Sequence, residues 1–499
     1  MKKLSLTYTK ISALVLCTLS CQATQQKGAD PVTESIPKAT ERKHAKPPAT
    51  PQRAPLSVTQ AEVEPLPDGP VTAGGTGEAS WPLSGALGVT RGGGRLTASD
   101  YAQMRELGIR HLRMELRWDS VVERERGKYH FESYVEDHAA MQAHGICPIY
   151  LLAYSNKLYD KDGFTMNEAA EQEAFAAFAA AAVARFDGPG VLWELGNEPE
   201  TSKMWPARAG GNTEPAARER ARHFMAMARA AIPAMRARSP EVKIISGGII
   251  DPHWKVAKAW LEEAFSLGLL QLFDGVGVHG YGHPLLPTEL RFSSGLQNLR
   301  QRILRHGGPA DYPIYQTEFG VGLHNHDTSG PMPERLRQQA AGGIRMFLMT
   351  SWLGLQTNTY YQWRFSGKHH ESGNERGILS PNGARRPLYH ATKILSQQLR
   401  GYTFERRIEL GTEQDFLFSF TGHKGRLWVG WTLGQPHTVN VPLPLPEPDG
   451  PTQAMMQAMT TTDMLGHTRP LTARAGQVAI HLTEEPQYLG PSRRPPTLN

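Results

Sequence analysis

The stretch Ile109-Arg110-His111-Leu112-Arg113-Met114-Glu115-Leu116 alternates apolar and polar side chains with a period of two. In a β-strand this period places the two leucines and Met114 on one face, and His111, Arg113 and Glu115 on the other. We expect the apolar face to pack beneath helices and the polar face to point toward the axis of a closed barrel. A purely structural barrel would fill that axis with Val, Ile and Leu, so the ionisable groups indicate a functional interior.

Seven further apolar runs share this rhythm and are predicted as strands, at 84–89, 147–153, 190–197, 242–247, 274–280, 313–318 and 356–363. Amphipathic helical patterns lie between them, most clearly at 171–186, 215–238, 256–270, 333–352 and 389–399. Eight strand–helix units over roughly 320 residues predict an α/β fold, a (β/α)8 barrel at 81–401. A doubly wound open sheet would alternate similarly, but no Gly-rich phosphate loop opens any of the helices.

The pattern changes after Gly401. Short alternating strands separated by Gly and Pro turns are predicted at 416–420, 427–432, 438–441 and 477–482. This pattern is typical of an all-β domain, and we expect a small sandwich-like unit at 402–490, followed by a tail at 491–499.

The N-terminus resembles an export signal. Three lysines precede the apolar run Ile11–Leu19, which is too short to span a bilayer, so residues 1–21 are predicted to be a signal peptide. The run ends at Ser20-Cys21, which resembles a bacterial lipoprotein processing site where Cys21 becomes lipidated; an ordinary cleaved signal peptide is the alternative. Residues 22–80 are rich in Pro, Thr and Ala and predict a disordered linker. We therefore expect an exported protein, either anchored by lipid at the outer membrane or cell surface, or periplasmic or secreted.

The composition and net charge of the 499-residue chain disfavour some classes of binding partner. The chain is 39% hydrophobic with a formal net charge of +6, which is only mildly basic for this length. No dense Lys/Arg block interleaved with aromatic residues occurs in the predicted folded region, so nucleic-acid binding is disfavoured. An anionic polysaccharide or a cell-surface partner fits the charge better. The oligomeric state stays open.

Two glutamates follow predicted strands of the barrel. Glu198 ends the run Trp193–Pro199, and Glu318 ends the run Tyr315–Gly320. Because catalytic residues of such barrels lie at the C-terminal ends of several strands, we expect the two carboxylates to meet. A pair of carboxylates is the minimum equipment for cleaving a glycosidic bond, with one protonating the leaving oxygen and the other attacking the sugar carbon.

The surrounding motifs resemble a known group of enzymes. Asn197-Glu198-Pro199 resembles the acid/base motif of the retaining clan A glycoside hydrolases, and Thr317-Glu318-Phe319-Gly320 resembles their nucleophile strand. The segment Trp118–Phe131 is similar to the second βα loop of families 39 and 5, whereas Gly196–Pro199 also occurs in family 79. The resemblance covers roughly residues 84–490 and is most specific at the two motifs. It implies a retaining O-glycosidase that acts on a poly- or oligosaccharide, with Glu198 as acid/base, Glu318 as nucleophile, and neither cofactor nor metal.

The resemblance also implies roles for nearby polar residues. Asn197 would hydrogen-bond the 2-hydroxyl of the reacting sugar, Tyr281 would contact the nucleophile, and His279 would line the cleft. Arg113 would hold Glu318 ionised, because a carboxylate beside a guanidinium is favoured in its charged form. An ordinary core salt bridge of Arg113, to Glu194 or Glu115, is the alternative, and one network could contain both.

Aromatic and histidine residues complete the candidate site. Trp363 resembles the tryptophan on which the reacting sugar stacks, although a core-filling role is the alternative; Tyr154 and Trp118 are further cleft candidates. The segments His324–Asp327 and His369–Glu371 lack the helical spacing of a zinc protease site, so we expect substrate-loop residues there rather than metal ligands.

Two other functions are compatible with the same sequence. A transglycosidase would use the same pair of glutamates with a sugar hydroxyl in place of water. A non-catalytic carbohydrate-binding or surface-assembly protein would not need both glutamates, and their presence argues against it.

Overall fold

The computed structural model describes residues 83–92, 94–281, 288–323, 331–365, 375–422, 425–442, 459–471, 473–474 and 477–491. The predicted signal peptide with Cys21, the predicted linker and both His-rich segments lie outside these residues. Within them, no helix is both long enough and apolar enough to cross a membrane.

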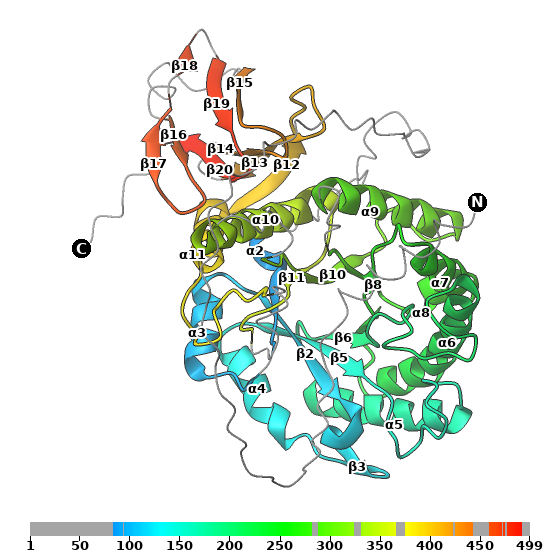
Figure 1. The fold of residues 1–499 in the computed structure, drawn as a ribbon. Coiled ribbons are helices and arrows are strands. Elements are labelled where there is room, and N and C mark those ends of the chain that lie inside the picture. Colours follow the sequence, from blue (N-terminus) through cyan, green and yellow to red (C-terminus); the bar gives the residue numbers. More distant parts are fainter. Residues whose placement is uncertain are drawn as a thin grey trace, which may run out of the picture. The chain divides into compact units, whose positions relative to one another are not determined.

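A parallel sheet forms the centre of the structure, as Figure 1 shows. Its order is β7-β6-β5-β2-β1-β11-β10-β9-β8. The bounds are β1 Leu87–Thr90, β2 His111–Arg117, β5 Cys147–Ala153, β6 Leu192–Leu195, β7 Lys243–Ser246, β8 Ile249–Ile250, β9 Val276–His279, β10 Ile314–Phe319 and β11 Asn358–Tyr360. The two end strands, β7 and β8, flank Gly247-Gly248, and a parallel bridge from Ile245 to Gly275 joins β7 to the segment leading into β9. These pairings close the sheet and confirm the predicted barrel.

Helices surround the strands (Figure 1). The main ones are α3 Ala98–Glu106, α4 Glu132–Ala143, α5 Ala169–Phe186, α6 Glu214–Arg236, α7 Lys255–Ser266, α9 Thr288–Arg305, α10 Met332–Leu353 and α11 Pro387–Leu399. Short elements are α2 Leu83–Ala86, α8 Leu269–Leu272, a π-helical turn η1 Trp118–Val122, and a hairpin of β3 Glu123–Glu125 with β4 Lys128–Tyr129. Each of the five patterns singled out in the sequence forms a helix, with the 256–270 pattern divided between α7 and α8.

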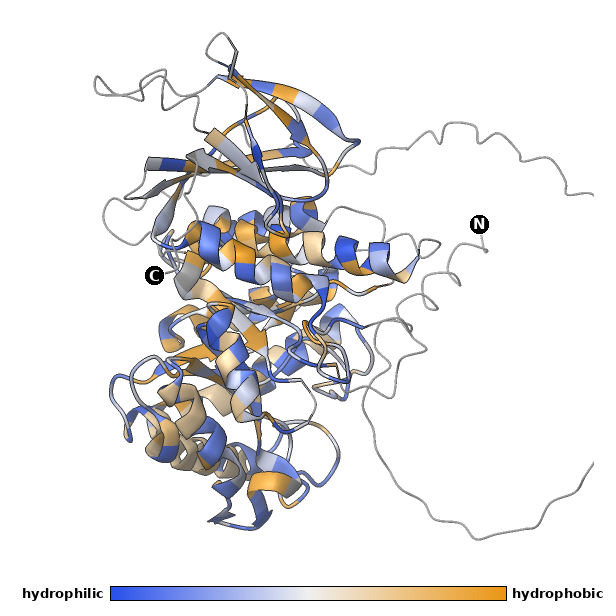
Figure 2. Ribbon diagram, turned by 90° about the vertical axis from the view of Figure 1, so that its left-hand side faces the viewer, coloured by the Kyte–Doolittle hydropathy of each residue, from blue (hydrophilic) through white to orange (hydrophobic). Residues whose placement is uncertain are grey.

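Local sequence fixes where some helices begin. Thr97 accepts a hydrogen bond from the Asp100 amide while the Asp100 carboxylate accepts one from the Thr97 amide, a reciprocal capping box at the start of α3. At the start of α6 the Thr213 side chain accepts a hydrogen bond from the Ala216 amide, and Pro215 follows in the first turn. Hydrophilic and hydrophobic residues alternate along the helical ribbons in Figure 2, as expected for helices that cover a barrel.

The apolar core lies between the strands and these helices. In β2, Leu112, Met114 and Leu116 are at most 1% exposed, which confirms the predicted apolar face. The opposite face carries Arg113 and Glu115 into the barrel, where Arg113 contacts Glu194 of β6 and Glu115 contacts Tyr154, which follows β5. The period-two pattern therefore placed both faces of this strand correctly.

Two antiparallel sheets follow the barrel. One has the order β12-β13-β14-β20-β16-β17, with bounds Tyr402–Arg407, Asp415–Gly422, Gly425–Thr432, Gln487–Pro491, Met459–Thr462 and Thr468–Pro470. The other has the order β15-β19-β18, with bounds His437–Pro442, Gln477–Leu482 and Ala473–Arg474. A separate apolar cluster that includes Leu417, Val441, Ile480 and Leu489 joins the two sheets, so the C-terminal part is sandwich-like.

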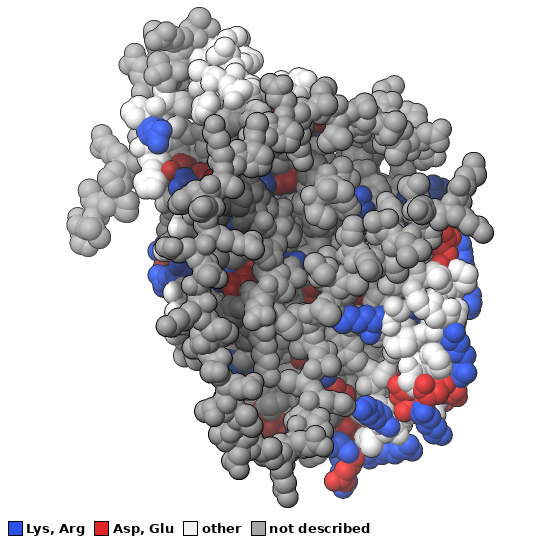
Figure 3. Space-filling model, viewed as in Figure 1, with Lys and Arg blue, Asp and Glu red and all other residues white. Residues whose placement is uncertain are grey.

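The outer barrel surface carries mixed charge. Figure 3 shows Lys and Arg interspersed with Asp and Glu on the side where α6 and α7 lie in Figure 1. Arg222 of α6 pairs with Glu263 of α7 at 2.9 Å, and Arg236 lies 3.6 Å from Asp274. This face is therefore not the basic patch that a nucleic-acid-binding surface would need.

Candidate active site

Glu198 lies in the loop that follows β6. Its backbone has a φ of 44°, in the left-handed region that favours glycine and costs a side chain about 1–3 kcal/mol. The loop is held by Thr201, whose amide and hydroxyl both donate to the Glu198 carbonyl, at 2.9 and 3.0 Å. Arg220, buried in α6, donates to the Glu200 carbonyl at 2.9 Å. These contacts fix the loop around Glu198, a residue that is 7% exposed.

Glu318 lies near the end of β10, where the strand register is irregular. The pairing of β10 with β9 shifts between Gln316 and Glu318. Such an irregularity re-aims side chains beside a site, and here Thr317 as well as Glu318 reaches the barrel interior. The Thr317 hydroxyl donates to Glu194 at 2.8 Å, while the Glu318 carboxylate contacts Arg113. The period-two alternation of a regular strand is therefore interrupted at this point.

Arg113 joins the carboxylates. Its Nε donates to Glu194 at 2.6 Å, and its Nη1 donates to Glu318 at 2.5 Å. Its Nη2 donates to the Asn197 side-chain oxygen at 2.9 Å, which leaves the Asn197 amide group directed as a donor. Both roles considered for Arg113, the core salt bridge and the contact to Glu318, occur in one network. The Glu194 carboxylate also accepts from the Gly248 amide, so this buried charge is satisfied.

His279 and Tyr281 reach the same carboxylates from the end of β9. The Tyr281 hydroxyl donates to Glu318 Oε2 at 2.7 Å, as the sequence predicted for this tyrosine. His279 Nδ1 lies 3.0 Å from Glu198 Oε1 and 3.8 Å from Glu318 Oε2. His279 is fully buried, so it supports the two glutamates from beneath and does not itself line a cleft as predicted.

The surroundings of Glu318 favour its charged form. Burial acts to raise its pKa, but the charges of His279 and Arg113 and the hydrogen bonds from Tyr281 and Arg113 outweigh burial. The pKa of Glu318 is consequently held below its ordinary value. A carboxylate that stays ionised is what a nucleophile requires.

The Tyr281 contact gives a test of this pKa effect. Tyr281→Phe removes one donor from the Glu318 carboxylate, so the pKa of Glu318 should rise, by about one unit for a single charged hydrogen bond. A nucleophile must be ionised to act, so with Glu318 in that role the acid limb of the kcat/KM profile should move to higher pH. Measuring kcat/KM from pH 3 to 8 for both proteins checks this, and an unmoved or lowered acid limb would contradict the assignment.

The two glutamates are close together. An oxygen of Glu198, a nitrogen of His279 and an oxygen of Glu318 all lie within 4.8 Å of one another. Retaining glycosidases hold their carboxyl groups about 5–5.5 Å apart, whereas inverting enzymes leave about 6.5–9.5 Å for a water molecule. The separation therefore matches a retaining geometry.

Glu200 is a third acidic residue near the site, and it was not predicted from the sequence. Glu200 follows Glu198 by two residues, is fully buried, and accepts a hydrogen bond from the Ile250 amide at 2.7 Å. Burial, and then the neighbouring Glu198 carboxylate, raise the pKa of Glu200 well above its ordinary value. Its place in the same loop was visible in the sequence, but its burial depends on the path of the loop after Pro199.

Two of the predicted aromatic contacts are wrong. Trp363 is fully buried, and its indole nitrogen donates to Asp100 of α3 at 2.8 Å, so it belongs to the core as in the alternative interpretation. Trp118 is also fully buried and stacks on Tyr159 at a centroid distance of 5.5 Å. Tyr361, two residues before Trp363, is partly exposed instead. Burial and the charges of Glu318 and Glu115 raise the pKa of Tyr361.

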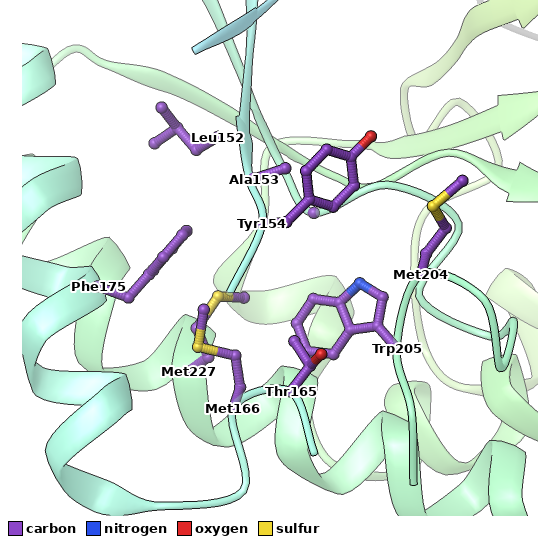
Figure 4. Close-up of a pocket in the computed structure, with 10 residues that line it drawn as sticks. Leu152, Ala153, Tyr154, Thr165, Met166, Phe175, Met204, Trp205 and Met227 are labelled. Carbon is purple, nitrogen blue, oxygen red and sulfur yellow. The ribbon is translucent and has the colours of Figure 1, made fainter. Parts of the chain in front are cut away.

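Tyr154 borders both the carboxylates and a small apolar cavity. Its hydroxyl donates to Glu115 at 3.0 Å, and its pKa is raised by burial and by Glu115, with the Glu318 charge contributing. Figure 4 shows the Tyr154 ring at the edge of a cavity that Trp205, Phe175 and Met227 also line. Most lining residues are buried and apolar, so the cavity belongs to the packing between strands and helices.

Solved structures resemble this chain, although no protein-family model and no curated protein sequence matches it. A family 39 glycoside hydrolase from the gut symbiont Bacteroides cellulosilyticus WH2 superposes with a TM-score of 0.64 at 20% identity, covering 83% of this chain and 81% of that chain. The family 39 enzyme from Xanthomonas axonopodis pv. citri gives 0.55 at 14%, covering 82% and 95%. A family 30 subfamily 8 xylanase from Clostridium acetobutylicum gives 0.55 at 13%, covering 81% and 95%. This chain has the fold of the family 39 glycoside hydrolases.

The same three side chains could in principle hold a cation. Among the described residues, Glu198, His279 and Glu318 form a group compact enough for a metal ion. However, both Glu318 oxygens already accept hydrogen bonds, from Arg113 and from Tyr281. A guanidinium at this distance would repel a cation. These contacts favour hydrogen bonding of the side chains with one another over a metal site.

Proposed function

We propose that this protein is a retaining O-glycoside hydrolase that acts on a poly- or oligosaccharide. The observation that carries the proposal is the asymmetric pair of close carboxylates. Arg113 and Tyr281 hold the Glu318 carboxylate, whereas the Glu198 carboxylate contacts only His279 among the described hydrogen-bonding groups. The fold of family 39 glycoside hydrolases supports it. The xylanase activity of the family 30 relative belongs to that protein and leaves the sugar of this chain open.

The proposed reaction proceeds in two displacements. In the first, a Glu318 oxygen attacks the anomeric carbon while Glu198 gives its proton to the leaving oxygen, so that the glycosidic bond breaks and a glycosyl ester forms on Glu318. In the second, the Glu198 carboxylate takes a proton from water, whose oxygen attacks the same carbon and releases Glu318. Each displacement inverts the centre, so the overall reaction retains configuration.

The surrounding residues have separate tasks in this scheme. Arg113 and Tyr281 keep the attacking carboxylate ionised, and the Asn197 amide is left to donate to a hydroxyl of the bound sugar. A contact to the 2-hydroxyl strengthens as the transition state forms, which would lower the barrier. His279 lies against both glutamates and fixes their mutual position.

A panel of aryl glycosides tests this function. We expect the full chain to release the aryl group from at least one member of a panel that covers the common pentoses, hexoses and uronic acids. A transglycosidase would show the same release, with transfer to an added sugar exceeding hydrolysis. Absence of release from every member, and of cleavage of any bacterial exopolysaccharide tested beside it, would contradict a glycosidase.

Export through a lipid anchor is a separate part of the proposal, supported by the basic N-terminus, the apolar run and Cys21. Cys21→Ser should move the protein from the membrane fraction to a soluble fraction, because the modified sulfur would be lost. Cell fractionation with N-terminal mass spectrometry checks this. An unchanged membrane fraction, or a mature wild-type N-terminus other than Cys21, would remove the lipoprotein proposal and leave the glycosidase proposal standing.

A further inference from the structure

Arg376 is a charged residue beside the proposed site that the reaction scheme does not use. It follows β11 in the segment 375–386, whose backbone is tied to the barrel. The Ile378 amide donates to the Gln362 carbonyl at 3.0 Å, and the Leu379 amide donates to the Trp363 carbonyl at 2.9 Å. Gln339 of α10 donates to the Glu375 carbonyl at 2.7 Å. Arg376 therefore projects from a fixed backbone.

The guanidinium of Arg376 lies against the tyrosine that contacts the nucleophile. Its Cζ is 5.2 Å from the centroid of the Tyr281 ring, and the Tyr281 hydroxyl donates to Glu318. Gly320 makes this approach possible, because a Cβ there would lie only 2.6 Å from Arg376 Cδ and 3.4 Å from its Nε. Since Gly320 follows Glu318 by two residues, the cation sits at the C-terminal end of the nucleophile strand.

No carboxylate in the described part of the chain pairs with this cation. Arg376 is partly buried, and its Nε is buried without a hydrogen-bond partner. The adjacent Glu375 carboxylate accepts from Arg386. Buried donors in folded proteins are normally paired, and leaving one unpaired costs about 1–3 kcal/mol. Only the Nε is buried in this way; the side chain as a whole is partly exposed, so a ligand in the site can supply acceptors to the rest of the guanidinium.

We propose that the saccharide substrate carries an anionic oxygen group, a carboxylate or a sulfate ester, and that Arg376 binds it. The inference rests on the proposed glycosidase function and deepens it by naming the substrate class. A planar guanidinium forms two parallel hydrogen bonds to a carboxylate or to two oxygens of a sulfate. The net charge of +6 over the whole chain is compatible with an acidic polymer.

The test compares matched neutral and acidic substrates. Wild-type protein, Arg376→Gln and Arg376→Lys are assayed on 4-nitrophenyl glucoside, glucuronide and 6-sulfoglucoside, and on the corresponding galactose series, in both anomers. We expect kcat/KM of the wild type to favour an acidic member over its neutral counterpart by at least about tenfold. Arg376→Gln should reduce that ratio by about 10- to 100-fold, and Arg376→Lys should reduce it less, because lysine keeps the charge without the planar fork.

The chain contains a matched control for an arginine stacked on a tyrosine. Arg385 lies 4.4 Å from the Tyr389 ring centroid and pairs with Glu106, on the outside of the barrel. Arg385→Gln should leave the acidic-to-neutral ratio unchanged. The uronides carry a carboxylate and the 6-sulfated glycosides carry a sulfate ester. The substrate that the wild type prefers therefore shows which of the two groups Arg376 binds.

Two results would overturn the proposal while the glycosidase function survives. One is a wild type that cleaves neutral members as well as or better than acidic ones. The other is an equal loss on acidic and neutral members in Arg376→Gln, which would show that Arg376 acts only by positioning Tyr281. If no glycoside is cleaved, binding of glucuronate, glucose 6-sulfate and glucose is compared by ligand-observed NMR. If the protein binds glucuronate or glucose 6-sulfate in preference to glucose, and Arg376→Gln weakens that binding, the anion site is supported although the glycosidase function is not. If no such preference is found, both proposals are wrong.

Discussion

Glu318→Ala should abolish turnover on every substrate, with a loss of at least about 10⁴-fold in kcat for activated and unactivated glycosides alike. The nucleophile forms the covalent bond in the first displacement, so no leaving group, however good, can replace it. The measurement is kcat and kcat/KM on an aryl glycoside with an activated leaving group, with the purified full chain.

This loss must be separated from misfolding, because Glu318 is one of two carboxylates on Arg113. Glu318→Gln keeps the volume and one acceptor and should be equally inactive while melting close to the wild type. Added azide should partly restore turnover in Glu318→Ala, since a small anion fits the space left by the carboxylate. Retention of more than about a hundredth of wild-type activity in both folded variants would contradict Glu318 as nucleophile.

Glu198→Ala should instead produce a loss that depends on the leaving group. A general acid contributes typically about 10²–10⁴-fold where the leaving oxygen needs a proton, so natural saccharides and alkyl glycosides should lose that much. A dinitrophenyl glycoside needs no proton, and its first displacement should be nearly as fast as in the wild type. The missing base then slows the second displacement, so a burst of dinitrophenol should precede slow turnover.

Stopped-flow absorbance resolves this burst, and intact-protein mass spectrometry should detect the glycosyl-enzyme that accumulates. The control is Glu318→Ala on the same substrate, which should show no burst. Equal losses for Glu198→Ala and Glu318→Ala on the activated substrate would show that the two roles are wrongly assigned.

The sequence predicted most of the fold because its periodicity is strong. The alternation in β2 predicted which side chains face the helices, and Leu112, Met114 and Leu116 are buried there. The eight predicted strand runs all overlap observed strands, whereas β8 lies beyond the predicted run 242–247 and is divided from β7 by Gly247-Gly248. That division depends on close backbone approach: a Cβ at Gly247 would lie 2.3 Å from the Gly196 carbonyl oxygen. Contacts between distant segments leave little trace in a single sequence.

Site residues that belong to sequence motifs were predicted well. Residues whose position depends on the conformation of a loop were predicted poorly. The predicted contacts of Arg113 and Tyr281 with Glu318 occur in the structure. Trp363 was misplaced because its role depends on which way the segment after β11 turns. Its indole bonds to the buried Asp100, a residue that the capping box of α3 holds in place. The burial of Glu200 depends likewise on a loop conformation.

The anomeric configuration of the first product tests the central claim, double displacement through Glu318, most directly. Proton NMR follows the hydrolysis of whichever anomerically pure aryl glycoside the enzyme cleaves fastest, from the first minutes, before mutarotation mixes the anomers. Carboxylate oxygens within 4.8 Å of each other leave too little room for an attacking water, so we expect the first-formed sugar to have the configuration of the substrate. First appearance of the opposite anomer would contradict a glycosyl-enzyme on Glu318 and would require single displacement by water.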